Sequence, residues 1–308
     1  EFNGGVYGLP LTENFPMLFY RTDVLEELGY TEPPATWDDL INMLPDIQRK
    51  YLEVGLILPS NISSQVFDAG NTFVLLMLQT GQDFYNFDEA SGQYVSTTFD
   101  TEAAVEAFTK WTKFYTVYDF DQTYDAFTRF RTGEMPIGFA DYVAMYNQLS
   151  IFATEIKDLW EFVPVIGMED ENGNINNTSI STVTAMMMMN GCEKKDNAWK
   201  FMDWYVSADT QSNYANEMVA IVGQGAMYAT ANKEALESLP WSTTDLNNIL
   251  AQYNNLAAIP EMPGGYIITR YVQFAFLDAY NNNADPVESF LGYVDDINKE
   301  ITRKRKEF

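Results

Sequence analysis

The sequence predicts an α/β fold. Helix signals recur along the chain with short apolar, β-like runs between them, which is the pattern of alternating helices and strands. Hydrophobic residues make up 46% of the 308 residues and aromatic residues 15%, enough for the core of one large domain or two of ordinary size. The longest apolar runs are far shorter than the ~20 residues of a membrane-spanning helix. We therefore expect a globular chain that does not span a bilayer.

Local signals in the first two thirds of the chain define the elements in order. Residues 3–10, NGGVYGLP, are typical of a turn followed by a short strand. Thr36 and Asp39 form a capping box that starts a helix, which we expect Pro45 to kink or shorten. The further expected elements are a helix over 68–80, a hairpin over 86–99, helices over 101–118 and 124–132, and strands over 135–140, 160–166 and 181–189.

From Lys194 onward the sequence becomes largely helical. Asp285 and Pro286 start the last helix, which reaches Arg303, and the earlier helices cover 196–206, 208–218, 232–239 and 244–256. The methionine run 186–189 invites a metal-site or flexible-pocket interpretation. Because consecutive strand residues point to opposite faces, a buried strand is the favoured interpretation.

Charge and residue types exclude several classes of function. With 44 acidic and 18 basic residues, the formal net charge is -26, which would repel nucleic acid and anionic membranes and favours a neutral ligand. The chain has no histidine, so serine–histidine and cysteine–histidine catalysis and imidazole metal sites are excluded. Its single cysteine, Cys192, allows no internal disulfide. We expect neither a cofactor nor a metal site.

Several motifs, in a fixed order, carry a family resemblance. They are VYGLPLTENFPMLFYRTDVLEELGYTEPPATWDDL from Val6, FRTGEMPIG from Phe130, FVPV from Phe162 and DNAWKFMDWY from Asp196. Together they resemble the family 1 extracellular solute-binding proteins of bacterial ABC importers, the group that includes the maltose-binding proteins, although Val165 departs from the P-x-P pattern. The last part, PEMPGGYIITRYVQFAF and DPVESFLGYVDDINKEITRKRKEF, is most similar to lipoprotein-type members from Gram-positive bacteria.

The resemblance implies a periplasmic-binding-protein-like fold of type II, with two α/β lobes closing on a ligand. It assigns residues 6–178 and 233–308 to the second lobe and 179–232 to a mostly helical remnant of the first. Hinge strands are expected near 4–10, 176–182 and 223–231. NGGVYGLP corresponds to the family's first crossover, so the chain is expected to lack about the first third of the family's length.

That mapping leaves an apolar face on the remnant with part of its usual cover missing. The face comprises Val183, Ala185, Met187, Phe201 and Trp204. Exposed patches of that size are rare on stable monomers, so something must shield it. A preceding segment, self-association or a rearranged lobe would each do so.

The resemblance also implies where the cleft residues lie. The candidate ligand-binding residues are Asn71, Phe73, Asp141, Tyr142, Ser179, Ser181, Tyr266 and Arg270. Sugar recognition needs flat aromatic faces together with carboxylates, amides and hydroxyls. Several candidates keep an ordinary structural alternative: core packing for the aromatic residues, helix capping for Asn71, and an ion pair with an acidic neighbour for Arg270.

The function implied by the resemblance is ligand binding without chemistry. The chain would be the solute-binding component of an ABC importer, taking an oligosaccharide in an interlobe cleft and delivering it to membrane permease subunits. It would work outside the cell membrane, held by a lipid anchor in the full-length protein. Two alternatives stay open: a carbohydrate-active hydrolase using a carboxylate pair, or a degenerate module that no longer binds a ligand.

Overall fold

The computed structural model describes residues 5–56 and 72–307. The strands are β1 (Leu9–Asn14), β2 (Pro16–Arg21), β3 (Val54–Gly55), β4 (Tyr85–Asp88), β5 (Gln93–Thr97), β6 (Ile137–Asp141), β7 (Trp160–Val163), β8 (Met168–Glu169), β9 (Ile175–Asn176) and β10 (Thr182–Met186). The α-helices are α1 (Thr22–Leu28), α2 (Trp37–Arg49), α3 (Thr72–Gln79), α4 (Glu102–Thr116), α5 (Ala126–Thr132), α6 (Tyr142–Phe152), α7 (Lys195–Val206), α8 (Ala208–Val222), α9 (Lys233–Glu237), α10 (Thr243–Tyr253), α11 (Ile268–Asn282) and α12 (Pro286–Arg305). Short 3-10 helices are η1 (Thr154–Ile156), η2 (Gln224–Ala226) and η3 (Gly265–Ile267). The α/β class is confirmed.

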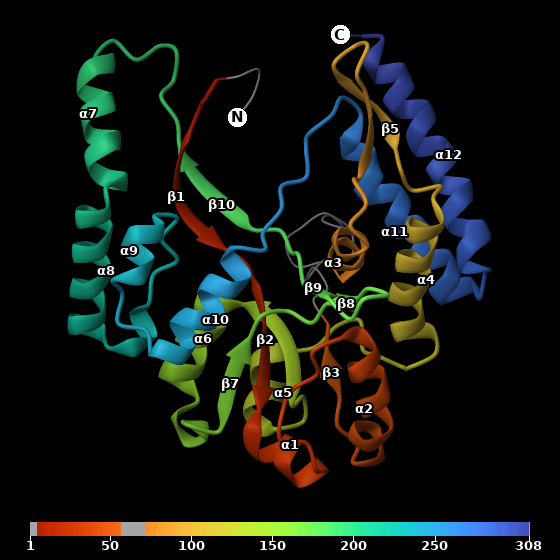
Figure 1. The fold of residues 1–308 in the computed structure, drawn as a ribbon, viewed down its shortest axis with the longest axis horizontal. Coiled ribbons are helices and arrows are strands. Elements are labelled where there is room, and N and C mark those ends of the chain that lie inside the picture. Colours follow the sequence, from red (N-terminus) through yellow and green to blue (C-terminus); the bar gives the residue numbers. More distant parts are fainter. Residues whose placement is uncertain (1–4, 57–71, 308) are drawn as a thin grey trace.

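A four-stranded sheet in the order β3-β6-β2-β7 forms the base of the molecule (Figure 1). β2 is buried along its whole length and pairs antiparallel with both neighbours, while β3 runs parallel to β6. β7 is an edge strand that α10 covers with two side-chain amides: Asn248 donates to the Phe162 carbonyl at 2.9 Å, and Gln252 accepts from the Val165 amide at 2.9 Å. Covering an edge in this way prevents it from pairing with another chain.

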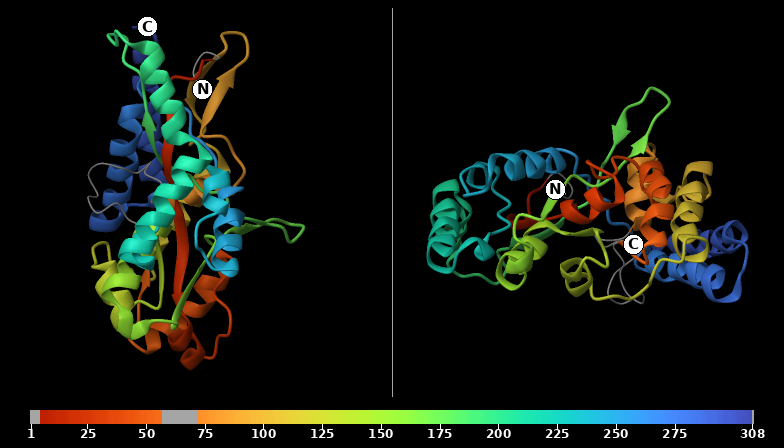
Figure 2. Two further views of the ribbon diagram at one scale, coloured as in Figure 1. Left: turned by 90° about the vertical axis from the view of Figure 1, so that its left-hand side faces the viewer. Right: turned by 90° about the horizontal axis from the view of Figure 1, so that it is seen from below.

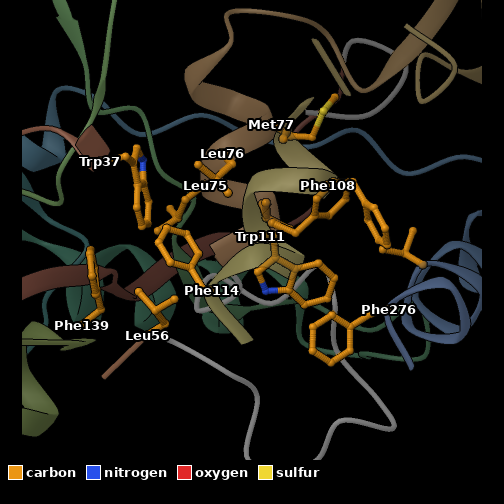
Figure 3. Close-up of a cluster of buried hydrophobic side chains, with 14 of the residues drawn as sticks. Trp37, Leu56, Leu75, Leu76, Met77, Phe108, Trp111, Phe114, Phe139 and Phe276 are labelled. Carbon is orange, nitrogen blue, oxygen red and sulfur yellow. The ribbon is translucent and has the colours of Figure 1, made fainter. Parts of the chain in front are cut away.

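The larger hydrophobic core lies between one face of this sheet and the helices α3, α4, α11 and α12. Aromatic rings fill it (Figure 3): Trp111 stacks on Phe276 with centroids 4.5 Å apart, and Trp37 stacks on Phe139 at 5.7 Å. Burying such side chains, each worth about 1.5–3 kcal/mol, is what holds the helices to the sheet. The helix expected over 101–118 is present as α4, and its apolar side chains, among them Phe108, Trp111 and Tyr115, lie in this core.

Helix ends follow the local signals. The Thr36 capping box is present, with its hydroxyl and the Asp39 carboxylate exchanging bonds with each other's backbone amides. Gly133 ends α5 in the left-handed conformation, directly after the helix expected over 124–132. The expectation that Pro45 shortens its helix is wrong, because α2 continues to Arg49. Buried side chains on both sides of the proline, Leu44 and Ile47, keep that helix packed on the core.

A second hydrophobic core lies under the other face of the sheet. α6 contributes the largest share, β2, β7, α5, α9 and α10 contribute further side chains, and Ala215 of α8 and Met227 after η2 also join it. Nearby, β1 pairs antiparallel with β10, and its opposite edge bonds to the chain around Ala229, where the Glu13 amide donates to the Ala229 carbonyl at 2.9 Å. The segment 179–232 is therefore tied to the rest of the chain by both a strand ribbon and a shared core.

β10 and α7, which lie toward the same end of the molecule (Figure 1), both carry exposed apolar side chains. Phe201 and Trp204 on α7 are 55% and 56% exposed, and Val183 and Met187 are similarly open. The predicted lack of cover over this face is confirmed for the described residues. The expectation of a buried methionine strand is wrong: β10 ends at Met186, and Met187 and Met189 are exposed because no described layer packs on the outer side of the ribbon.

The β8–β9 hairpin stands out from the body of the molecule in both views of Figure 2. It carries the polar turn after Glu169, in which Asp170 accepts from the backbone amides of Asn172 and Asn174. A carboxylate that caps its own turn in this way stabilises the loop without a partner segment. The hairpin therefore contributes little to either core.

Candidate functional site

A groove begins where the chain crosses into the β1–β10 ribbon. Ser179 forms a parallel bridge with Leu256: its amide donates to the Asn255 carbonyl at 3.0 Å, and its carbonyl accepts from the Ala257 amide at 2.8 Å. These bonds hold the crossover segment against the loop that follows α10. These two hydrogen bonds therefore hold the two segments that form the walls of the groove next to each other.

The groove itself has a volume of about 410 Å³, within the range of small-ligand sites. The segment after Ser179, the loop after α10, the start of α11 and the β4–β5 hairpin contribute to its walls. The lining residues are Tyr85, Ile180, Ser181, Val183, Ala257, Ala258, Ile259, Pro260, Glu261, Gly265, Tyr266 and Thr269. Apolar surface alternates with hydroxyl and carboxylate groups, which is the lining that a polyhydroxylated solute needs.

Gly264 positions Tyr266 at the mouth of the groove. Its φ is +89°, and a Cβ atom at this position would lie 3.0 Å from the Ile301 Cα. Only glycine satisfies both the left-handed backbone and the close approach of α12. The tight turn at Gly264 then starts η3, and Tyr266 projects from it with 65% of its surface exposed.

The hydroxyl of Tyr266 is held by α12. It donates to Glu300 Oε1 at 2.7 Å, and Arg303 holds the same carboxylate through Nε and Nη2. The Arg303 guanidinium, followed by the Tyr266 hydroxyl, lowers the pKa of Glu300 to about 2. The hydrogen bond to Glu300 also raises the pKa of Tyr266. Since the Tyr266 hydroxyl already donates, it can only accept a further hydrogen bond from a ligand.

The opposite wall of the groove carries Ser181, whose hydroxyl donates to Glu13 Oε1 at 2.7 Å. Between the walls lie Glu261 and the nearly buried Tyr85, whose pKa is raised to about 12 by burial and then by the Glu261 charge. Glu261 is the charged residue among the described groove residues. Its carboxylate disfavours an anionic solute and can accept hydrogen bonds from hydroxyl groups.

The structure thus brings two of the predicted residues, Ser181 and Tyr266, into one groove, with Ser179 buried directly behind it. Arg270 lies on α11, exposed and outside the lining residues, and makes no ion pair within the described part of the chain. Asn71 lies outside the described residues.

The structure places the predicted aromatic partners Phe73 and Tyr142 in the cores. Phe73 packs in the larger core against Phe99 and Phe290. Tyr142 is fully buried at the start of α6, with its ring 4.6 Å from that of Phe15. Asp141, the residue before it, is half-buried at the N-cap of α6. Neither ring is presented to the groove in this structure.

Sequence reasoning missed two lining residues, Tyr85 and Glu261, and two carboxylates that hold lining residues from behind, Glu13 and Glu300. Glu261 falls inside the PEMPGG motif, so its place beside the glycine pair could have marked it. Glu13 and Glu300 reach the site through partners that lie 168 and 34 positions away along the chain. A local sequence pattern does not predict hydrogen bonds between residues that are so far apart along the chain.

The α/β fold and the candidate groove between the β1–β10 ribbon and the start of α11 are typical of one class of protein, the α/β ligand-binding proteins. The chain belongs to the bacterial extracellular solute-binding protein family, whose family model matches residues 1–236. Within the described residues, no helix is both long and apolar enough to cross a membrane, and no group of acidic or cysteine side chains has the arrangement of a metal site.

Solved structures share the fold at low sequence identity. The sugar-binding protein MalE of Xanthomonas citri superimposes with a TM-score of 0.75 at 16% identity, covering 100% of this chain and 74% of that one. An ABC transporter solute-binding protein of Thermotoga lettingae, bound with α-D-tagatose, gives 0.74 at 15% identity, covering 98% and 74%. Maltose-bound MalE3 of T. maritima gives 0.71 at 20% identity, covering 96% and 73%.

A curated relative adds a short match. A probable ABC transporter-binding protein of Deinococcus radiodurans is 40% identical to this chain over 45 residues. Those residues are 15% of this chain and 11% of that protein. The match covers a small part of the relative's length, whereas the structural likeness extends over almost the whole of this chain.

Proposed function

We propose that this chain is the solute-binding component of an ABC importer and that its groove takes an oligosaccharide. The observation that carries the proposal is the groove lining: the exposed ring of Tyr266 on one wall and the hydroxyl of Ser181 on the other, with Glu261 between them. An aromatic face packs against the apolar side of a sugar ring, and the polar groups pair with its hydroxyls. Solved relatives that contain tagatose and maltose support the same solute class.

The proposed mechanism is lobe closure. Residues 6–178 and 233–308 would form one lobe and residues 179–232 part of the other, with hinges near 4–10, 176–182 and 223–231. The groove lies where these segments meet, so a ligand bound there contacts both. Such a ligand shifts the open and closed populations by as much as its affinity differs between the two states.

The proposed location and partners of the chain follow from its family. The chain would work outside the cell membrane, hand its solute to permease subunits, and be held at the surface by a lipid anchor. The family name and the fold support an extracellular role. Lipid anchoring can be tested by following the full-length protein in membrane fractions before and after treatment that removes lipid-bearing N-termini.

We further propose that the exposed apolar face of β10 and α7 is covered in the working protein, either by a segment that packs on it or by a second copy. Phe201 and Trp204 are the large rings left open there. Size-exclusion chromatography with light scattering tests this proposal. Concentration-dependent dimers that are lost in Trp204→Ser support a second copy, whereas a monomer with full sugar binding at all concentrations counts against any need for cover.

A thermal-shift screen of neutral oligosaccharides, including maltose and cycloalternan, tests the function. Sugars should raise the midpoint of unfolding, while glucuronate and sugar phosphates should not, because the Glu261 carboxylate and the net charge of -26 repel anions. Chromatography of the same mixtures should show the sugar unchanged. Release of shorter sugars would instead identify a hydrolase, and an absence of any shift would favour a module that no longer binds a ligand.

A further inference from the structure

A second pocket, separate from the groove, opens beside the edge strand β7 near the base of the molecule, where α6, β7 and α10 lie together (Figure 1). Its volume is about 460 Å³, and it shares no lining residue with the groove. The lining residues are Tyr146, Leu149, Ser150, Thr154, Lys157, Asp158, Trp160, Glu161, Gln224 and Asp245. Side chains from α6, η1, β7, η2 and α10 therefore converge on one space.

Two partly exposed aromatic rings form a corner of this pocket. The rings of Tyr146 and Trp160 are 5.7 Å apart and nearly perpendicular, at 76°. Phe19 packs behind Trp160 at 6.0 Å, and the Tyr146 hydroxyl donates to Gln224 Oε1 at 3.4 Å. Because each ring is held from behind or by its hydroxyl, the corner is formed before any ligand enters, which lowers the entropic cost of binding.

Polar groups of several kinds face the same space. Glu161 Oε2 accepts from the Tyr20 hydroxyl at 2.6 Å, which fixes that carboxylate and leaves its other oxygen available within the described contacts. Asp245 lies in the first turn of α10, and burial, followed by the nearby Glu161 charge, raises its pKa. The Gln224 amide and the hydroxyl of Ser150 complete a set of both donors and acceptors.

We propose that this pocket is a second carbohydrate site, which takes a neutral sugar ring against the Tyr146–Trp160 corner. The combination of aromatic surface, carboxylates, an amide and hydroxyls is the lining that a ring of alternating hydroxyl and C–H groups requires. Three carboxylates, of Asp158, Glu161 and Asp245, against the single ammonium of Lys157 disfavour anionic sugars. The proposal does not depend on the groove, because none of these residues lines it.

Fluorine NMR of protein labelled with 5-fluorotryptophan tests the site directly. The chain has 6 tryptophans, and Trp160→Phe assigns the resonance of Trp160 by its disappearance. Titration with maltose should move that resonance in the wild type and equally in Tyr266→Ala, which removes the exposed aromatic ring of the groove. In Asp245→Asn with Gln224→Ala, the apparent Kd from the Trp160 resonance should rise about tenfold, because hydrogen bonds to the sugar are lost. Glucuronate should leave the resonance unmoved.

The opposite results separate this proposal from the groove. A Trp160 resonance that no neutral sugar of the panel moves would overturn the second site, whatever the groove binds. A shift that disappears in Tyr266→Ala would show an indirect effect of groove binding and would equally overturn it. Circular dichroism of each variant establishes that the fold is retained. If the polar double variant is unfolded, Gln224→Ala alone, at an exposed position of η2, provides the same comparison.

Discussion

Replacing Tyr142 with phenylalanine should stabilise this protein. The Tyr142 side chain is fully buried and its hydroxyl is buried with no hydrogen-bond partner among the described residues. Burial, with a smaller contribution from the Glu13 charge, raises the pKa of this phenol, so it stays neutral. A buried polar group left without a partner costs about 1–3 kcal/mol, whereas the ring contacts with Phe15 and Trp241 survive the change. We expect a gain of about 1 kcal/mol.

Urea denaturation and calorimetry measure that gain, and for a chain of this size about 1 kcal/mol corresponds to a rise of about 2 °C in the unfolding midpoint. Tyr20→Phe is the matched control, because its hydroxyl donates to the Glu161 carboxylate at 2.6 Å, and its loss should cost about 1 kcal/mol. A clear loss of stability in Tyr142→Phe would refute the reasoning by showing a hidden partner. A fall in sugar affinity with no gain in stability would instead indicate that the Tyr142 hydroxyl takes part in sugar binding.

Three further predictions concern single positions. Thr36→Ala removes the capping box of α2 and should lower the free energy of unfolding by about 1 kcal/mol in urea denaturation; an unchanged value would contradict the role of the cap. Gly264→Ala should cost more than Gly29→Ala, since both glycines have positive φ but only Gly264 has a neighbour within reach of the new methyl group; equal losses would refute the contact with α12. The pKa of Asp245 is raised in the native state, so the native state binds this proton more tightly than the unfolded state does. The free energy of unfolding of the wild type should therefore fall as the pH rises from the ordinary carboxyl pKa through the native pKa. Asp245→Asn should remove that fall, and parallel pH profiles of stability for the two proteins would contradict the pKa shift.

Local sequence signals were sufficient to predict most helix ends and the β4–β5 hairpin. A cap residue such as Thr36 or Ser207 acts within one turn of the chain, so the sequence alone contains the whole interaction. The sheet order β3-β6-β2-β7 is different, because each pairing joins segments that are far apart along the chain. Hydrophobic strand patterns indicate which residues are buried but do not identify the partner strand.

The candidate site was predicted in part for the same reason. Tyr266 and Tyr142 were both chosen by their place in the family's order, each as an aromatic residue at a helix start. The structure shows that Gly264 creates the turn that exposes Tyr266, whereas Tyr142 lies beneath Phe15. The difference depends on what packs above each helix start. A one-dimensional pattern does not contain that information.

The methionine run shows where a pattern and its surroundings diverge. Four consecutive apolar residues are typical of a strand buried on both faces, which requires a layer on each side. In the described structure β10 pairs only with β1, and its outer face stays open, so Met187 and Met189 are exposed. The sequence pattern thus predicts burial of both faces of this strand, whereas no layer in the described part of the chain covers its outer face.

Isothermal titration calorimetry of the groove tests the central claim most directly. The best sugar from the thermal-shift screen would be titrated into the wild type, Tyr266→Ala and, as a control, Tyr51→Ala, which removes an exposed ring outside the groove. We predict saturable binding to the wild type and the Tyr51 variant, and a Kd at least about tenfold higher, or about 1.4 kcal/mol weaker, for Tyr266→Ala. Equal affinity in all three proteins, or no heat with any sugar in the wild type, would contradict the assignment of the groove as the solute site.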